Sequence, residues 1–254
     1  MKILLGALIN RRPQVECWLR HLARIDLTDV VPSWAFILDG DEDWARRTVG
    51  AAGLPGEIIF QSAPPGQRYI REEANKEQAY QRLAAMRNCL FQLAAELEAE
   101  AYLTCDTDII AKPEVLQRLL ETGHVWVSAL VRNSNVSPNI FNVAMLGDGA
   151  AAPAIRHFNA IVSQDGRWVC VDYDGKPTGN VGNAEMIGAI CLYRRDFWQR
   201  VRFKGHRCGE DVGLAYEAKA AGIPGHFIPV LCEHLMYPNH VPMHKERCQL
   251  CPKS

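Results

Sequence analysis

Short apolar runs alternate with amphipathic helical patterns through the first half of the chain, and this alternation limits the fold more than any other feature. Uninterrupted apolar runs at 3–9, 34–38 and 101–105 predict strands that are buried on both faces. Apolar residues recur every three or four positions over 15–22 and about 75–98, which predicts two amphipathic helices. Strands that alternate with helices favour an α/β fold with a mostly parallel sheet flanked by helices.

The second half of the chain interrupts this pattern and then resumes it. From 132 to 183, Asn, Gly, Pro and Ser accumulate and the helical periodicity is lost, which indicates an insertion. Within it, the apolar residues on either side of Asp165 and Gly166 predict a β-hairpin. The other elements that we expect are strands at 57–61, 125–131 and 226–230, a further α/β segment at 186–193, and helices after Pro113, at 195–201 and at 211–221.

Length and composition restrict the class of protein. The chain has 254 residues, 48% hydrophobic and 22% charged, which fits one large domain or one domain with an insertion. The net charge of -1 gives no reason to expect nucleic acid or an anionic membrane as a partner. No apolar run is long enough for a transmembrane helix. Several of the nine cysteines lie in apolar runs, so we expect a reduced, cytoplasmic protein.

Two carboxylates, Asp106 and Asp108, directly follow the apolar run at 101–105. Ligands of open α/β sheets bind outside the carboxyl ends of the strands. A pair of carboxylates at that place suits Mg²⁺ or Mn²⁺, and substrate phosphates commonly fill the open positions of such an ion. Asp also suits helix caps and turns, so the Asp-x-Asp triplet alone leaves a purely structural role open.

Further motifs accompany this triplet in a fixed order. The segment from Arg82 to Asn88 lies on the helix before it, Gly188 opens an apolar segment that ends in two arginines, and Gly209-Glu210-Asp211 opens a late helix, with His234 after the last strand. In order and spacing these motifs resemble GT-A nucleotide-sugar glycosyltransferases, closest to the family 2-like group. The resemblance covers about residues 3–235 and implies a GT-A-like (Rossmann-like) domain at 1–235, followed by a tail at 236–254.

The resemblance also implies an activity and its residues. The expected reaction is metal-dependent transfer of a sugar from a nucleoside-diphosphate sugar to an acceptor, with inversion. Asp106 and Asp108 would hold Mn²⁺ or Mg²⁺, with His234 as a third ligand that favours Mn²⁺ somewhat. Asp211 would be the general base, with Glu210 as its nearest rival. Both acids also suit the first turn of a helix for electrostatic reasons alone.

Residues at the ends of the first strands match family positions near the base and ribose of the nucleotide. They are Ala7, Ile9 and Asn10 at the end of the first strand, Asp39 after the second, and Arg87, and Asp106 is counted with them. Arg87 is a plausible donor to the base or a phosphate, and a solvated helix face is its alternative. Arg11 and Arg12 lie at the same end of the sheet and could meet the diphosphate.

The insertion at 132–183 lies between the metal motif and the base motif. Long irregular connections in compact domains are usually lids or binding loops. We therefore expect this segment to border the acceptor site and to be partly mobile without ligand, with Gly179, Gly182 and Gly188 as hinges. A static hairpin that only extends the sheet is the alternative. No motif identifies the acceptor, which could be a glycan, a lipid or a protein.

Other functions share parts of this pattern. A nucleotidyltransferase has a similar architecture and paired carboxylates, but its Gly-rich basic loop after the first strand has only a faint counterpart here. A non-catalytic nucleotide-sugar-binding protein would keep the metal ligands and lack the base. Asp41 and Asp43 fit neither a dehalogenase nucleophile pair nor a calcium loop, and we expect a solvated turn there.

The tail at 236–254 carries residues that are typical zinc ligands. Their spacing is H-x₃-H-x₃-C-x₂-C, formed by His240, His244, Cys248 and Cys251. A structural Zn²⁺ is one expectation for this tail. A partly disordered, proline-rich end is the other.

Overall fold

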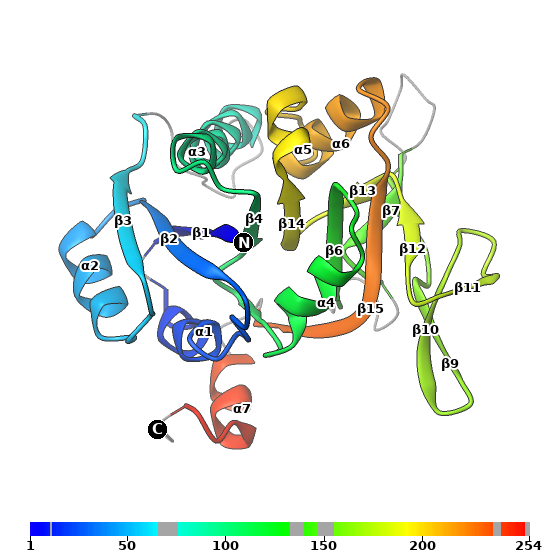
Figure 1. Cartoon of the computed structure of the whole chain (residues 1–254), viewed down its shortest axis with the longest axis horizontal. Coiled ribbons are helices and arrows are strands. Elements are labelled where there is room, and N and C mark those ends of the chain that lie inside the picture. Colours follow the sequence, from blue (N-terminus) through cyan, green and yellow to red (C-terminus); the bar gives the residue numbers. More distant parts are fainter. Residues whose placement is uncertain (11, 66–75, 133–139, 147–154, 236–239, 252–254) are drawn as a thin grey trace.

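A twisted central sheet with helices on both faces forms the body of the molecule (Figure 1). The computed structural model describes residues 1–10, 12–65, 76–132, 140–146, 155–235 and 240–251. The strands of the central sheet are β1 (Lys2–Ile9), β2 (Val31–Leu38), β3 (Glu57–Ser62), β4 (Ala101–Cys105), β5 (Ile109–Ile110), β6 (Trp126–Val131), β12 (Gly182–Ala184), β14 (Ile190–Arg194) and β15 (Gly225–His234). The helices are α1 (Val15–Leu22), α2 (Glu42–Gly50), α3 (Lys76–Glu96), α4 (Val115–Glu121), α5 (Arg195–Arg200), α6 (Glu210–Ala220) and α7 (His240–Arg247).

The strand order is β12-β15-β6-β14-β4-β1-β2-β3, with β5 paired to the end of β15. The strands β3, β2, β1 and β4 are parallel neighbours, and β15 is parallel to β6. By contrast, β14 is antiparallel to both β4 and β6. The loop before β14 therefore reaches the edge of the sheet where β4 and β6 end. The mostly parallel sheet predicted from the alternation of elements is confirmed.

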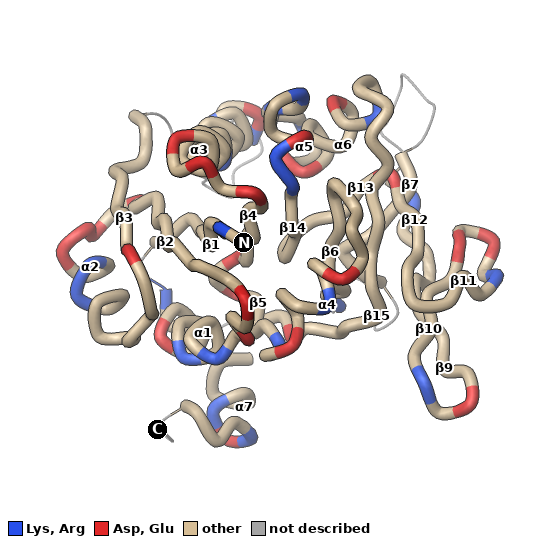
Figure 2. The backbone as a smooth tube through the Cα atoms, viewed as in Figure 1, with Lys and Arg blue, Asp and Glu red and all other residues tan. Residues whose placement is uncertain are grey.

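Two apolar layers cover the faces of the sheet. Side chains of α1 and α4 pack with one face, and those of α3, α5 and α6 pack with the other. In Figure 1 the second group lies above the sheet and α1 and α4 lie below it. Charged residues of both signs are spread over the helices and turns, while most of the length of the central strands carries none of them (Figure 2). Among the described helices, none has the length and apolar character needed to cross a membrane.

The inserted segment forms two small sheets beside the central one. One contains β9 (Ile161–Gln164), β10 (Arg167–Val171) and β11 (Pro177–Gly179), and the other contains β7 (Val143–Met145), β8 (Arg156–His157) and β13 (Met186–Ile187). The predicted hairpin is confirmed as β9 and β10. Its turn has positive φ at both central residues, 49° at Asp165 and 75° at Gly166, as tight hairpins require. Residues 133–139 and 147–154 of the insertion lie outside the described residues.

The last strand is longer than the sequence indicates. We expected it over 226–230, but β15 continues to His234. Its pairing with β6 shifts register between Ile228 and Leu231, a stretch that contains Pro229. Proline cannot donate to a ladder, so the pattern looks like a strand end, although the chain resumes pairing beyond it.

The C-terminal tail packs against the main body. Val241 on α7 and Cys251 are both 5% exposed and belong to the same apolar layer as α1. Burial of these side chains attaches the tail to α1. Residues 236–239 and 252–254, which include two of the three prolines of the tail, lie outside the described residues.

Close packing of α6 gives a stability prediction. A Cβ on Gly213 would lie 2.0 Å from the carbonyl oxygen of Lys204, a backbone atom that cannot easily move. Gly213→Ala should therefore lower the free energy of unfolding by about 1–3 kcal/mol, although Ala favours helices. Gly50→Ala is the matched control, because Gly50 ends α2 with nothing within 4 Å of its Cβ position. Urea unfolding of both variants tests this, and a Gly213→Ala protein as stable as the wild type would contradict it.

Candidate active site

The Asp106-Thr107-Asp108 triplet lies directly after β4, at its carboxyl end. The backbone N–H of Asp106 donates to the carbonyl of Ala189 at 2.9 Å, and that of Ile109 donates to the carbonyl of Asp106 at 2.9 Å. These bonds close a tight turn between β4 and β5. Both carboxylates therefore stay at the edge of the sheet that the loop before β14 also reaches.

Pairing between β5 and β15 brings His234 to this turn. His234 lies opposite Ile109 in the ladder, and the N–H of Leu235 donates to the carbonyl of Asp108 at 2.7 Å. As a result, Nε2 of His234 lies 3.6 Å from Oδ2 of Asp108. Burial opposes the ionisation of Asp108, but His234, the charge of Arg12 and a backbone hydrogen bond together lower the pKa of this carboxyl.

Arg87, on α3, is buried against the carboxylates of the site. Its Nη2 donates to Oδ1 of Asp106 at 2.9 Å, and its Nε donates to Oε1 of Glu210 at 3.0 Å. The side chain is only 9% exposed, so the solvated helix face considered for Arg87 is wrong. The structure gives Arg87 the role of joining two acids. Its expected contact with the nucleotide stays a prediction.

The first turn of α6 presents two acids in different surroundings. Gly209 precedes the helix with φ 132°, a conformation that residues with a side chain avoid. Glu210 is buried and paired with Arg87. Among the described residues, none forms a hydrogen bond or ion pair with the carboxylate of Asp211. Burial, followed by the neighbouring charge of Glu210, raises the pKa of Asp211 to about 8.

A cavity of about 250 Å³ lies among these groups. The polar side chains that line it are Asp106, Asp108, Asp211, His234, Asn142 and His157. The expected metal ligands and the expected base therefore share one cavity, and Glu210 lies beside it. The last two lining residues come from the insertion, so the described part of this segment borders the site.

Asn142 is a residue of the site that sequence reasoning missed. Its amide donates to the carbonyl of Gly188 at 2.6 Å and to that of Ala129 at 3.1 Å, and its Oδ1 accepts from the N–H of Val131 at 2.7 Å. The side chain thus joins the end of β6 to the loop before β14. Nothing local in the sequence distinguishes this asparagine from the others in the polar insertion.

Two of the three glycines expected to act as hinges are explained by close packing. A Cβ on Gly182 would lie 2.2 Å from the ring of Phe227, and one on Gly188 would lie 2.6 Å from Oδ2 of Asp211. Gly188 thus lets the backbone approach the acid, which a larger residue would displace. Gly179 has φ 89° and nothing within 4 Å of its Cβ position, but it pairs with Cys170 in the ladder of β10 and β11, and its role as a hinge stays a prediction.

The residues expected near the nucleotide lie at the ends of β1 and β2. The side chains of Ala7 and Ile9 are buried in the core, and the carbonyl of Ile9 accepts from the N–H of Asp39 at 2.8 Å. A ligand can therefore meet Ala7 only through its backbone. Asn10 differs from them, because its Oδ1 is buried without a hydrogen-bond partner among the described residues. Arg11 lies outside the described residues.

Asp39 is held by an arginine to which the sequence assigned no role in the site. Arg82 on α3 donates two hydrogen bonds of 3.0 Å to the carboxylate of Asp39, one from each Nη. Its Nε donates to the carbonyl of Pro64 at 3.2 Å. The one signal in the sequence was that Arg82 lies on the same long helix as Arg87. Asp41 caps α2 by accepting from the N–H of Trp44 at 3.0 Å, as a structural turn requires.

The side chains expected to bind the metal fit a hard divalent cation. Two carboxylates and an imidazole converge on one cavity, and Arg87 leaves one oxygen of Asp106 unbonded. Carboxylates suit Mg²⁺ and Mn²⁺, and the imidazole shifts the preference toward Mn²⁺. A site with three protein ligands also keeps open positions for phosphate oxygens.

Comparison with solved structures finds the same architecture at low sequence identity. The crystal structure of S. aureus TarS is 12% identical, with a TM-score of 0.51 over 92% of this chain and 60% of that one. The mannosyltransferase PcManGT from Pyrobaculum calidifontis, in complex with GDP-Man and Mn²⁺, is 11% identical, with a TM-score of 0.52 over 97% of this chain and 60% of that one. The chain thus spans about 60% of the length of either protein. These likenesses show the GT-A fold of nucleotide-sugar glycosyltransferases.

Comparison of the sequence with protein-family models and with the curated proteins gives no match.

The raised pKa of Asp211 predicts a dependence of stability on pH. Between the ordinary value of 3.8 and about 8, the folded protein holds one proton more than the unfolded chain, so stability falls as pH rises. The slope is at most about 1.4 kcal/mol per pH unit. Asn does not titrate, so the variant needs no such proton to fold. In EDTA, its melting temperature should exceed that of the wild type at pH 7–8, and the difference should disappear near pH 4.

Melting curves between these two pH values check this prediction, with Asp43→Asn as the control. Asp43 is an exposed acid on α2, and its loss should leave the pH dependence unchanged. Parallel curves for Asp211→Asn and the wild type would show that Asp211 titrates as an ordinary acid.

Proposed function

We propose that the chain transfers a sugar from a nucleoside-diphosphate sugar to an acceptor hydroxyl and requires a divalent metal. One observation carries this proposal: Asp106, Asp108, His234 and Asp211 line the same cavity at the sheet edge where α/β folds bind ligands. In the GT-A fold, such a cavity supplies both a metal site and a base. The complex of PcManGT with GDP-Man and Mn²⁺ supports the same class of donor and cofactor.

The metal would be held by Asp106, Asp108 and His234. When bound, such an ion neutralises the charge that develops on the leaving diphosphate. Arg87 keeps Asp106 in place while leaving its second oxygen free. Arg12, whose charge lowers the pKa of Asp108, lies near enough to meet a phosphate of the donor as well.

The reaction is a single in-line displacement with inversion at the anomeric carbon. The acceptor oxygen forms a bond to the anomeric carbon, and the bond from that carbon to the phosphate oxygen breaks. The electron pair leaves with the nucleoside diphosphate, and Asp211 accepts the proton of the acceptor hydroxyl. A base with a pKa near the working pH is well matched to this task.

Asp211 fits the role of base better than Glu210. Glu210 is buried, and Arg87 occupies one oxygen of its carboxylate. Asp211 is unpaired among the described residues and borders the cavity. Glu210 then acts on the site through Arg87 as a positioning residue.

The nucleotide would lie across the ends of β1 and β2. The unpartnered Oδ1 of Asn10 offers an acceptor for an N–H group of a base or a hydroxyl of a ribose. Asp39, oriented by Arg82, offers a second acceptor beside it. A bidentate arginine fixes the carboxylate in one orientation, as recognition of a ribose or a base requires.

The acceptor would enter from the side of the insertion. Asn142 and His157 belong to this segment and line the catalytic cavity. A second cavity of about 500 Å³ shares His234 with it and is also lined by Arg132 and Arg247. This neighbouring space is large enough for a sugar ring, and Glu233, which pairs with Arg247, also lines it.

Loss of either carboxylate of the triplet should abolish metal-dependent nucleotide binding. Asp106→Asn and Asp108→Asn keep the size of the side chain and remove the charge that the metal needs. The measurement is a thermal-shift panel of UDP-, GDP-, ADP- and TDP-sugars with Mn²⁺, in which a ligand at about 100 times its dissociation constant adds roughly 2.7 kcal/mol. The control variant is Asp43→Asn, which should bind as the wild type does.

The same panel separates the rival functions. Nucleotide binding that survives EDTA would contradict the metal assignment. Formation of a nucleotide sugar from a nucleoside triphosphate and a sugar phosphate, with release of pyrophosphate, would identify a nucleotidyltransferase. Metal-dependent binding without sugar transfer or hydrolysis would identify a non-catalytic binding protein.

Replacement of the base should separate binding from turnover. Asp211→Asn is expected to bind the nucleotide sugar nearly as well as the wild type and to lose about 10²- to 10⁴-fold in kcat. Wild-type turnover should rise with pH as Asp211 loses its proton, and the variant should lack this rise. Full turnover in Asp211→Asn together with its loss in Glu210→Gln would move the role of base to Glu210. If neither change lowers kcat, the inverting mechanism proposed here is incorrect.

A further inference from the structure

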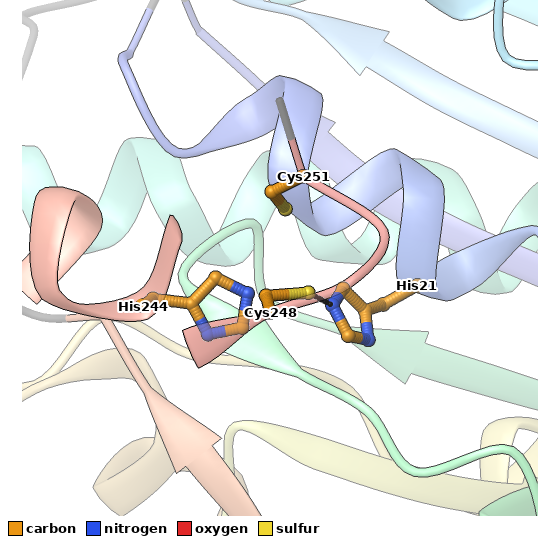
Figure 3. Close-up of side chains that lie close together, drawn as sticks. All are labelled: His21, His244, Cys248 and Cys251. Atoms are coloured by element: carbon orange, nitrogen blue, oxygen red, sulfur yellow. Dashed lines mark hydrogen bonds between the residues drawn. The ribbon is translucent and has the colours of Figure 1, made fainter. Parts of the chain in front are cut away.

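A second cluster of metal-type ligands lies below the sheet, away from the catalytic cavity. Figure 3 shows His21 of α1 next to His244 of α7 and the two cysteines that follow this helix, Cys248 and Cys251. The ligand atoms of these four side chains all lie within 4.8 Å of one another. The sequence pattern of the tail had suggested His240 in place of His21, and the structure corrects that set.

The geometry excludes His240 from the cluster. Its Nδ1 lies 3.3 Å from the carbonyl oxygen of His234, on the side of the catalytic site. His21 takes its place because α1 passes beside the end of the tail, and its Nε2 lies 3.2 Å from Sγ of Cys248. Local spacing could not predict this ligand, since it is far away in the sequence.

We propose that His21, His244, Cys248 and Cys251 bind one structural Zn²⁺ ion. Zinc takes imidazole nitrogens at about 2.0 Å and thiolate sulfurs at about 2.3 Å, so the ligand atoms of a tetrahedral ion lie roughly 3.3–3.8 Å apart. The cluster needs only a small contraction to reach these separations. Two thiolates balance the charge of the ion, and four protein ligands leave no position open for chemistry.

The orientation of His244 supports this assignment. Its Nδ1 lies 2.9 Å from Oε2 of Glu233. The other oxygen of Glu233, Oε1, accepts from Arg247 at 3.1 Å. The opposite nitrogen, Nε2, is buried without a hydrogen-bond partner among the described residues. A metal-bound histidine commonly has this arrangement, with a carboxylate on one ring nitrogen and the ion on the other. The unpartnered nitrogen is costly to bury unless a ligand occupies it.

The burial of the cluster also favours an ion. His244 is 4% exposed and Cys251 is 5% exposed, so these polar groups are removed from water. The ion would link α1 and the tail directly, and the end of β15 through Glu233. It would add to the apolar contacts of α7 that attach the tail. This proposal does not depend on the glycosyltransferase assignment.

Metal content provides the test. The untagged protein, purified with reductant in the presence of zinc and then dialysed against EDTA, should retain about one zinc per chain by elemental analysis. His21→Ala, Cys248→Ser and Cys251→Ser should each lose it. His240→Ala and Cys208→Ser are the matched controls and should keep it, because His240 faces His234 and Cys208 is an exposed cysteine elsewhere in the chain. Glu233→Gln should weaken zinc binding about 10-fold or more.

Two measurements on the unmutated chain cover the case in which the variants fail to fold. Titration with Co²⁺ should give the visible absorption of a tetrahedral thiolate site, and modification of the thiols should release the bound zinc to a colorimetric chelator. The zinc content of Asp106→Asn should match that of the wild type, which separates this site from the catalytic metal. A wild-type protein without zinc, a disulfide between Cys248 and Cys251 in the reduced preparation, or zinc lost from His240→Ala and kept in His21→Ala would each overturn the proposal.

Discussion

A buried arginine connects the segments that carry the acids of the candidate active site. Arg87 on α3 bonds Asp106 after β4 and Glu210 at the start of α6. Removing one partner from such a buried network commonly costs about 3–5 kcal/mol, because it leaves an uncompensated charge. The relative position of Asp106, the expected metal ligand, and Asp211, the proposed base, therefore depends on this side chain. The loop before β14 completes the arrangement, because Gly188 lets it approach Asp211 without a clash.

The same network assigns different protonation behaviour to neighbouring acids. The contact with His234 lowers the pKa of Asp108, which keeps it ionised and suited to a cation. Burial and the charge of Glu210 raise the pKa of Asp211, which suits it to accept a proton near neutral pH. A site that needs both a permanently charged ligand and a base gains from such a separation. Their surroundings therefore give these two aspartates, which have the same side chain, different affinities for a proton.

Local sequence patterns predicted the strands and helices, but not the contacts between residues that are distant in the sequence. The apolar run of β1 and the periodicity of α3 follow from burial of each element, so their bounds were predicted to within about two residues, whereas β2 begins at Val31, before the apolar run at 34–38. The contact between Asp108 and His234 arises from pairing of β5 with β15, and only family resemblance could indicate it. Asn142 and His21 carried no local signal, because folding brings them to their sites from distant segments. Three residues of the four-residue His/Cys cluster lie in the tail and could be predicted from their spacing, whereas His21, on α1, required the tertiary structure.

The end of β15 links the two polar sites of the molecule. Glu233 and His234 are consecutive residues of one strand, and successive side chains of a strand point to opposite faces. Glu233 contacts His244 of the cysteine-histidine cluster, while His234 contacts Asp108 of the candidate active site. A shift of register by one residue would exchange these two directions, so pairing with β5 at Ile110 and Ile109 is needed for both sites at once. An ion that fixes His244 would hold Glu233 and thereby restrict the register of the strand that presents His234.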